Sequence, residues 1–316
     1  MIMMGIRKYI ALGACLASAA AACGQSNTVY SFLRSDAGAR PAAMAGSFVS
    51  VSNDPTVLFY NPAGISTLDV PRGSVGFFKH LLDINAGYAV YSQEIPEIGH
   101  FAAGVLYTNY GSFDETDDLG NTLGTFSASD LAITLGYGGV LEENLYYGGA
   151  VKFIHSSLAG YGSSAAAADA GILYLIPQSS IALGASLRNL GAQLSTFAGV
   201  SEPLPIDFTL GASVVPRGLP LLLNLNFHKL NEDPGGFIDR FRAFTVGGEF
   251  TLSRVLQVRF GYNNEQRKDL KTGTTAGLAG FSAGLGITVA EYRVDYALSS
   301  LGTIGNLHRI SLSSSF

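Results

Sequence analysis

Few residues of this 316-residue chain have the types and spacing that chemistry requires. Residues 280–284, Gly-Phe-Ser-Ala-Gly, match the G-x-S-x-G pattern that places a nucleophilic serine on a strand-to-helix turn in hydrolases. Here the match lies in a glycine- and alanine-rich segment that alternates like a strand, and no helical pattern follows it. We interpret it as a chance match, and we predict that the protein is not an enzyme.

Metal-binding side chains are also scattered. No two of the five histidines have the i, i+2 or i, i+4 spacing of a preformed metal site. These histidines are His80, His100, His155, His228 and His308. The acidic stretches 114–118 and 142–143 could form a weak cation site, but a solvated loop and a solvated turn are the favoured interpretations. We therefore expect no metal and no cofactor.

The amino-acid composition argues against an ordinary soluble domain, a helical membrane protein and a nucleic-acid-binding protein. Only 14% of the residues are charged, 47% are hydrophobic and 39 are glycine, whereas about a quarter of an average soluble domain is charged. After residue 25 no stretch approaches the roughly 18 uninterrupted apolar residues of a spanning helix. The net charge is −5 and no basic block stands out, so we expect no nucleic-acid partner.

Residues 1–22 have the features of a secretory signal peptide. A basic pair precedes an apolar run, and the small residue Ala22 suits cleavage just before Cys23. Either Cys15 or Cys23 could instead accept a lipid, and the sequence leaves this open. Because both cysteines lie in or directly after the signal, no disulfide and no thiolate metal site can form in the mature chain.

From residue 72 to residue 316 the chain alternates with the period of a β-strand. In residues 291–298 the even positions are apolar, and the odd positions are polar or small. Fourteen such segments can be counted. They span residues 72–81, 84–95, 99–109, 126–138, 145–158, 165–175, 179–189, 205–215, 219–229, 241–252, 255–265, 274–288, 290–299 and 305–316.

The connections between these segments alternate between tight turns and longer polar stretches. The three longest are residues 111–125, 190–204 and 230–240. Short turns at one rim and long loops at the other are typical of a bacterial outer-membrane barrel. We therefore predict an all-β protein in the outer membrane, in which residues 72–316 form a 14-stranded antiparallel transmembrane barrel in contact with lipid.

The C-terminus supports this prediction. Ile310, Leu312 and the terminal Phe316 share one face of the last segment, as in barrels whose aromatic C-terminus acts as an assembly signal for the barrel assembly machinery. A secreted β-sandwich or β-solenoid would also alternate, but it would normally carry more surface charge.

Several charged residues fall on the face that would line the inside of the barrel. They are Lys152, Arg188, Glu249, Arg259, Glu291, Arg293 and Asp295. Such side chains could line a pore, or they could pair across strands and fill the interior. We favour pairing.

Residues 26–71 do not alternate, and we predict a small irregular or helical unit there. Part of it resembles the PorV/PorQ family of outer-membrane proteins, which are relatives of the FadL barrel. The resemblance lies in residues 30–33, 37–50, 53–55 and 60–65, with further matches in 124–130 and 188–191. The motif positions are Arg40, Gly46, Asn61, Pro62 and Gly64. Pro41 and Ala45 depart from the family pattern.

The resemblance implies a hatch formed by residues 26–71 inside a 14-stranded barrel. It also implies membership of type IX secretion, in which the barrel anchors and docks a surface sortase and the other proteins that attach cargo to the cell surface. It brings no catalytic residues. The alternative function is a FadL-like channel for long-chain fatty acids or other hydrophobic compounds, and the sequence does not decide between the two.

Overall fold

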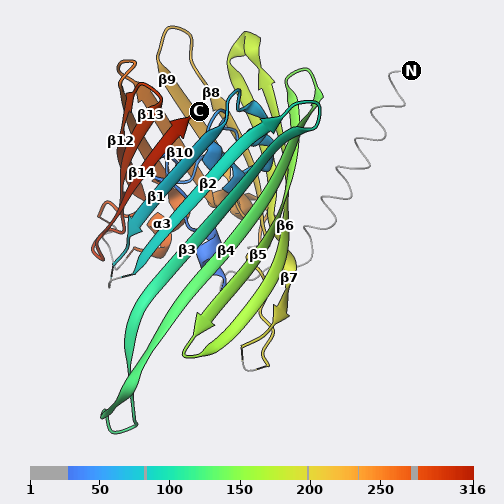
Figure 1. The fold of residues 1–316 in the computed structure, drawn as a ribbon. Coiled ribbons are helices and arrows are strands. Elements are labelled where there is room, and N and C mark those ends of the chain that lie inside the picture. Colours follow the sequence, from blue (N-terminus) through green and yellow to red (C-terminus); the bar gives the residue numbers. More distant parts are fainter. Residues whose placement is uncertain (1–27, 82–83, 198, 234, 272–276) are drawn as a thin grey trace.

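The computed structural model describes residues 28–316, except residues 82–83, 198, 234 and 272–276. The predicted signal peptide and both cysteines lie outside the described residues. In the described part, fourteen antiparallel strands close into a barrel (Figure 1), and each strand pairs with its neighbours in sequence while β1 pairs with β14. The strands are β1 (Arg72–Lys79), β2 (Asn85–Ile95), β3 (Gly99–Thr116), β4 (Thr122–Glu142), β5 (Leu145–Leu158), β6 (Tyr161–Ile176), β7 (Ile181–Ser195), β8 (Asp207–Val214), β9 (Leu221–Phe227), β10 (Phe244–Thr251), β11 (Leu256–Asn263), β12 (Phe281–Val289), β13 (Tyr292–Ser300) and β14 (Asn306–Ser315).

The predicted fold class is confirmed, and each predicted segment corresponds to one strand. The predicted facing of β13 is also correct. Tyr292, Val294 and Tyr296 point outward with 52%, 43% and 42% exposure, whereas Asp295 is 1% exposed inside the barrel. Among the described residues, no helix is long and apolar enough to cross a membrane.

Three sequence predictions are wrong. The connection expected at residues 190–204 begins later, because β7 continues to Ser195. Glu291 does not face the interior, because it lies exposed in the tight turn between β12 and β13. Residues 111–125 are not a loop, because β3 and β4 continue as a paired hairpin and leave only residues 117–121 as the connection. The hairpin projects beyond the other strands (Figure 1), so both of its faces can be polar and the alternation that marks a lipid-facing strand is lost.

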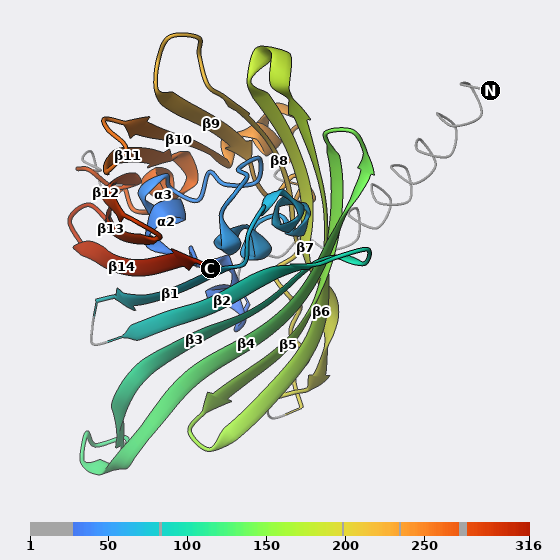
Figure 2. The same cartoon turned by 45° about the horizontal axis from the view of Figure 1, so that its top comes forward.

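Residues 28–71 lie inside the barrel, and we call them the hatch (Figure 2). They form short helices: η1 (Ser31–Arg34), α2 (Ala39–Ala43), η2 (Pro55–Phe59) and η3 (Pro62–Thr67). The last two start in the same way. Asp54 and Asn61 each accept a hydrogen bond from the backbone two residues on, and a proline follows each cap, where its fixed φ suits the first helical position.

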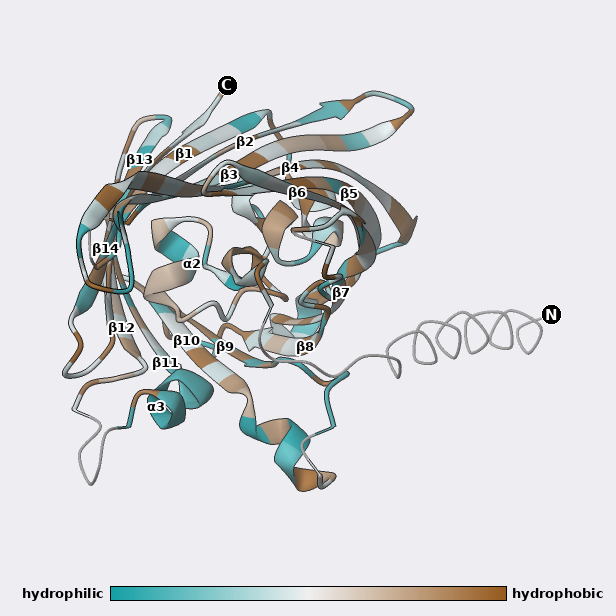
Figure 3. Ribbon diagram, turned by 90° about the horizontal axis from the view of Figure 1, so that it is seen from below, coloured by the Kyte–Doolittle hydropathy of each residue, from teal (hydrophilic) through white to brown (hydrophobic). Residues whose placement is uncertain are grey.

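Glycines in the barrel wall give the hatch its space. Side chains at Gly148 in β5 and at Gly184 in β7 would overlap the hatch backbone, at Pro62 and at Val49 respectively. Only glycine lets two backbones approach this closely. Figure 3 views the barrel from the end at which the β3–β4 hairpin projects and shows the hatch within the ring of strands.

Candidate functional site

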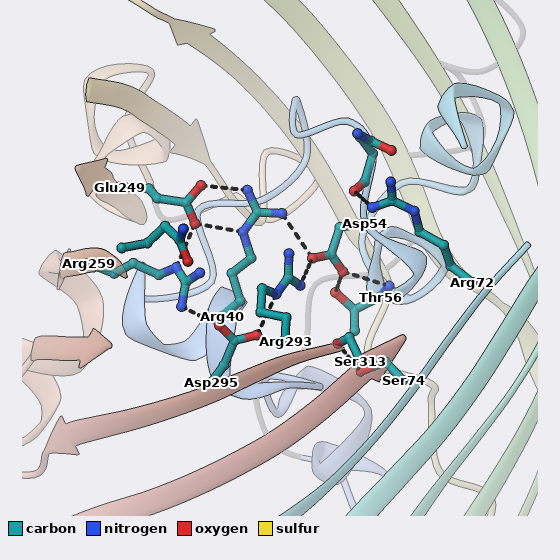
Figure 4. A network of polar contacts seen from close by, with 12 residues as sticks. Arg40, Asp54, Thr56, Arg72, Ser74, Glu249, Arg259, Arg293, Asp295 and Ser313 are labelled. Atoms are coloured by element: carbon teal, nitrogen blue, oxygen red, sulfur yellow. Dashed lines mark hydrogen bonds and ion pairs between the residues drawn. The ribbon is translucent and has the colours of Figure 1, made fainter. Parts of the chain in front are cut away.

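The hatch and the wall share a closed ring of charged side chains (Figure 4). Arg40 in α2 contacts two carboxylates. It donates to Asp54 of the hatch at 2.9 Å, and its Nε and Nη2 donate to both oxygens of Glu249 in β10, at 2.7 and 2.8 Å. A bidentate contact of this kind fixes the geometry as well as the charge. Arg40 thereby ties the hatch to the wall.

Three further side chains of the wall complete the ring. Arg259 in β11 contacts Glu249 at 2.5 Å and Asp295 at 2.6 Å. Arg293 in β13 contacts Asp295 at 2.9 Å and returns to Asp54 at 2.7 Å. Positive and negative groups therefore alternate around six buried or half-buried side chains. This arrangement meets the rule that buried charges need partners.

Asp54 keeps its charge in this ring. Burial by itself would raise the pKa of the Asp54 carboxyl, but the positive charges of Arg293 and Arg40 hold that pKa well below its usual range. The same carboxylate accepts hydrogen bonds from the backbone N–H and the hydroxyl of Thr56, at 3.0 and 2.5 Å. Asp54 therefore holds the start of η2 and the wall together.

Two further ion pairs lie elsewhere in the interior of the barrel. Lys152 Nζ lies 2.7 Å from Asp169 Oδ2 and donates to Asn189 at 2.7 Å. Arg188 contacts Asp207 at 2.5 Å and donates to the carbonyl oxygen of Phe59 in the hatch at 3.0 Å. Apart from Glu291, the charges expected to face the interior are there and pair across strands, which supports pairing over an open pore lining.

The other motif residues of the hatch have local structural roles. The Asn61 amide donates to the carbonyl oxygens of Val49 and Ile172, so it joins the hatch to β6. Gly46 has a φ of +74°, and Gly64 packs against Val57, where a side chain would overlap it.

The residues expected to form the C-terminal assembly signal lie on the outside and at one end of the barrel. Ile310 and Leu312 point outward from the barrel, and Phe316 lies beside Tyr91 at the opposite end from the hairpin, with 6.3 Å between ring centroids. Ala45, where the family often has glycine, adopts a φ of +53°. Such a conformation disfavours a side chain.

A pocket of about 620 Å³ opens at the end of the barrel where the β3–β4 hairpin projects. We call it the mouth pocket. It is lined by Val29, Tyr110, Phe113, Phe126, Ala128, Asp130, Ser156, Ser157, Leu158, Ala159, Tyr161 and Phe197. Phe113 and Phe126 are register partners on the hairpin, and their rings stack with centroids 5.4 Å apart.

The sequence interpretation missed this pocket because it assigned Phe113 to a polar loop. The signal that could have located it is the pair of aromatic residues at positions 113 and 126 within an otherwise polar stretch. Aromatic side chains in a polar surface segment commonly mark a place where apolar area is covered by a partner or a ligand.

The inner end of the mouth pocket is closed by the start of the hatch. Tyr30, Phe32 and Leu33 are buried against Ala132 and Ile154, which follow the pocket along the inward faces of β4 and β5. The Tyr30 hydroxyl lies 2.5 Å from Ser163 Oγ in β6. A molecule in the pocket is thus separated from the barrel interior by this segment of the hatch.

Comparison with known proteins identifies the fold. No family model and no curated protein matches the sequence. The toluene transporter TbuX of Ralstonia pickettii superposes with a TM-score of 0.61 at 11% identity, over 88% of this chain and 98% of that one. The Pseudomonas putida toluene transporter TodX gives 0.57 at 13% identity, over 88% and 98% of the two chains.

A FadL homologue of Pseudomonas aeruginosa gives a TM-score of 0.55 at 12% identity, over 89% of this chain and 98% of the homologue. The fold agrees with the predicted outer-membrane location. These likenesses do not test the PorV/PorQ resemblance, which stays a prediction. The chain has the fold of the FadL-like outer-membrane transporters.

Proposed function

We propose that the protein is an outer-membrane channel that admits small hydrophobic compounds, which it first binds in the mouth pocket. The observation that carries the proposal is the pocket itself. Its volume of about 620 Å³ and its mainly apolar and aromatic lining are those of a small-molecule site. Transport is supported by the fold, since two of the structures that share it are toluene transporters.

A ligand can pass from the mouth pocket into the barrel only if part of the hatch moves. The contacts that hold the hatch to the wall differ along its length. Residues 39–66 are held by the ring of charges and packed against wall glycines. The segment before them is held by the apolar packing of Tyr30, Phe32 and Leu33 and by fewer polar contacts. These include Thr28 to Pro203 at 2.6 Å and one ion pair, Arg34 with Glu232 at 3.0 Å. This first segment is therefore the part of the hatch that moves to admit a ligand.

A second candidate follows from the PorV/PorQ resemblance: a docking platform for a sortase and the other proteins of a type IX attachment complex. The specific observation in its favour is the tip of the β3–β4 hairpin. Leu119 and Leu123 are 87% and 66% exposed there, beyond the other strands. Exposed apolar residues on a projecting element suit a protein partner.

The test compares a strain lacking the gene with strains carrying two matched variants. Ala128→Phe fills the mouth pocket, whereas Ala166→Phe makes the same change on the outward face of β6. We expect the deletion and Ala128→Phe to lower the uptake of radiolabelled toluene, and Ala166→Phe to leave it unchanged. Unaltered toluene uptake in the deletion strain, together with loss of surface-attached cargo, would instead establish the platform.

A further inference from the structure

The mouth pocket has a polar floor within its apolar walls. Asp130 in β4 lies there with 6% exposure, and Tyr110 donates its hydroxyl to Asp130 Oδ2 at 2.6 Å. The register partner of Asp130 on β5 is Ser156, which is 3% exposed. The hydroxyl of Ser156 is fully covered and lies beside the Asp130 carboxylate, to which it can donate. Asp130 thus presents a buried carboxylate to a space that the described residues do not fill.

None of the described residues that line the pocket carries a positive charge that could balance Asp130. An ion pair with Asp130 would require a lysine, an arginine or a histidine, and none of these is among the residues that line the pocket. Within the described residues, the ion pairs of the barrel do not include Asp130. Residues 105–130, which run from β3 through the hairpin into β4, contain five acidic residues and no basic one, and the chain has no lysine or arginine between Lys79 and Lys152.

This electrostatic environment discriminates between ligands of the same shape. A carboxylate in the pocket would lose its hydration beside the uncompensated charge of Asp130, and like charges in a low-dielectric site repel strongly. A hydroxyl or amine would instead donate to Asp130, which has acceptor capacity beyond its bond from Tyr110.

We propose that the mouth pocket selects hydrophobic molecules that carry a hydroxyl or amine, such as aromatic alcohols and amines, and rejects carboxylates such as fatty acids, with Asp130 as the specificity-determining residue. This inference rests on the proposed function, because it assumes that the pocket holds the ligand. The pocket of about 620 Å³ has room for a molecule of one or two rings.

The test measures equilibrium binding of three probes of similar size to the purified full chain in detergent at neutral pH, followed by probe fluorescence. The probes are naphthalene, 1-naphthol and 1-naphthoate. Binding to Ala128→Phe, whose pocket is filled, measures partition into detergent and is subtracted. We expect the wild type to bind 1-naphthol at least about tenfold more tightly than 1-naphthoate, the effect of one hydrogen bond to a charged group.

Two variants test the role assigned to Asp130 in selecting between the probes. Asp130→Asn keeps the shape and an acceptor for Tyr110, and we expect it to bring the two affinities within about threefold by improving 1-naphthoate binding. Asp114→Asn removes a charge from the same hairpin outside the pocket lining and should keep the wild-type ratio. Heat-modifiable migration on gels checks that each variant is folded.

The possible results distinguish a failure of the assigned selectivity from a failure of the proposed function. Equal binding of 1-naphthol and 1-naphthoate to the wild type, or an unchanged ratio in Asp130→Asn, would overturn the assigned selectivity and leave a general hydrophobic pocket. If no probe binds above the Ala128→Phe background, the proposed function fails together with the inference. A ratio that collapses in Asp130→Asn and persists in Asp114→Asn supports the assignment.

Discussion

Asp54 of the hatch and Arg293 of β13 are 239 positions apart in the sequence, and their side chains form an ion pair at 2.7 Å. This contact joins the hatch, near the start of the described residues, to one of the last strands. The interior of the barrel can therefore be complete only after nearly the whole chain has been placed.

Replacing Asp54 with Asn should destabilise the barrel. The change removes a negative charge between Arg40 and Arg293, and removing one partner of a buried ion pair costs about 3–5 kcal/mol. We expect a lower temperature for the loss of the compact form in heat-modifiability gels. The control is Asp117→Asn, in the exposed turn of the β3–β4 hairpin. Equal temperatures for both variants would show that the ring does not stabilise the fold.

Stability should depend on pH only under strongly acidic conditions. The folded state holds the pKa of Asp54 below its usual range, so the Asp54 contribution is fully present above the unfolded pKa of about 3.9. It is lost as the pH falls through the lower, folded pKa. We expect acid titration of the purified barrel to show no Asp54-dependent change above about pH 5. An Asp54→Asn variant with the same acid midpoint as the wild type would contradict this.

The facing of β13 can be tested at Val294. Val294→Arg should impair assembly, because Val294 points outward to the lipid, where a charged side chain is unfavourable. Val294→Leu is the matched control and should assemble normally. We expect Asp295→Asn to lower stability as well, because Asp295 pairs with Arg259 and Arg293. The measurement is the fraction of heat-modifiable protein in the outer membrane.

Adjacent glycines in β5 provide a test of the hatch. Gly148→Val would place a side chain against the Pro62 backbone, whereas a side chain at Gly149 meets its nearest atom at 3.6 Å, an ordinary contact. We expect Gly148→Val to displace the hatch and to make it sensitive to proteinase K in purified protein, with the strands still closed. Protection of the hatch in Gly148→Val equal to that in Gly149→Val would show that the close approach is not required.

Much of the barrel can be predicted from the sequence because each strand meets lipid on one face. Tyr292 and Val294 alternate with Arg293 and Asp295 for this local reason. Beyond the membrane a strand no longer needs an apolar lipid-facing side, so its residues need not alternate. For this reason the extension of β3 through Phe113 was not predicted.

The ring and the mouth pocket depend on contacts between distant parts of the chain, which no local pattern records. Arg40 and Asp54 are recognisable as polar residues of a motif, but their partners lie about 200 positions away. The mouth pocket likewise joins Val29 of the hatch to Phe197 of the connection between β7 and β8.

The ring divides into two electroneutral halves. The hatch contributes one positive and one negative side chain, and the wall contributes two of each. Of the six ion pairs, only Arg40 with Glu249 and Asp54 with Arg293 cross between the halves. Insertion or withdrawal of Arg40 and Asp54 together therefore separates no net charge, and each detached half of the ring keeps its own internal pairs. The hatch can be seated in a narrow, poorly hydrated interior without a counterion.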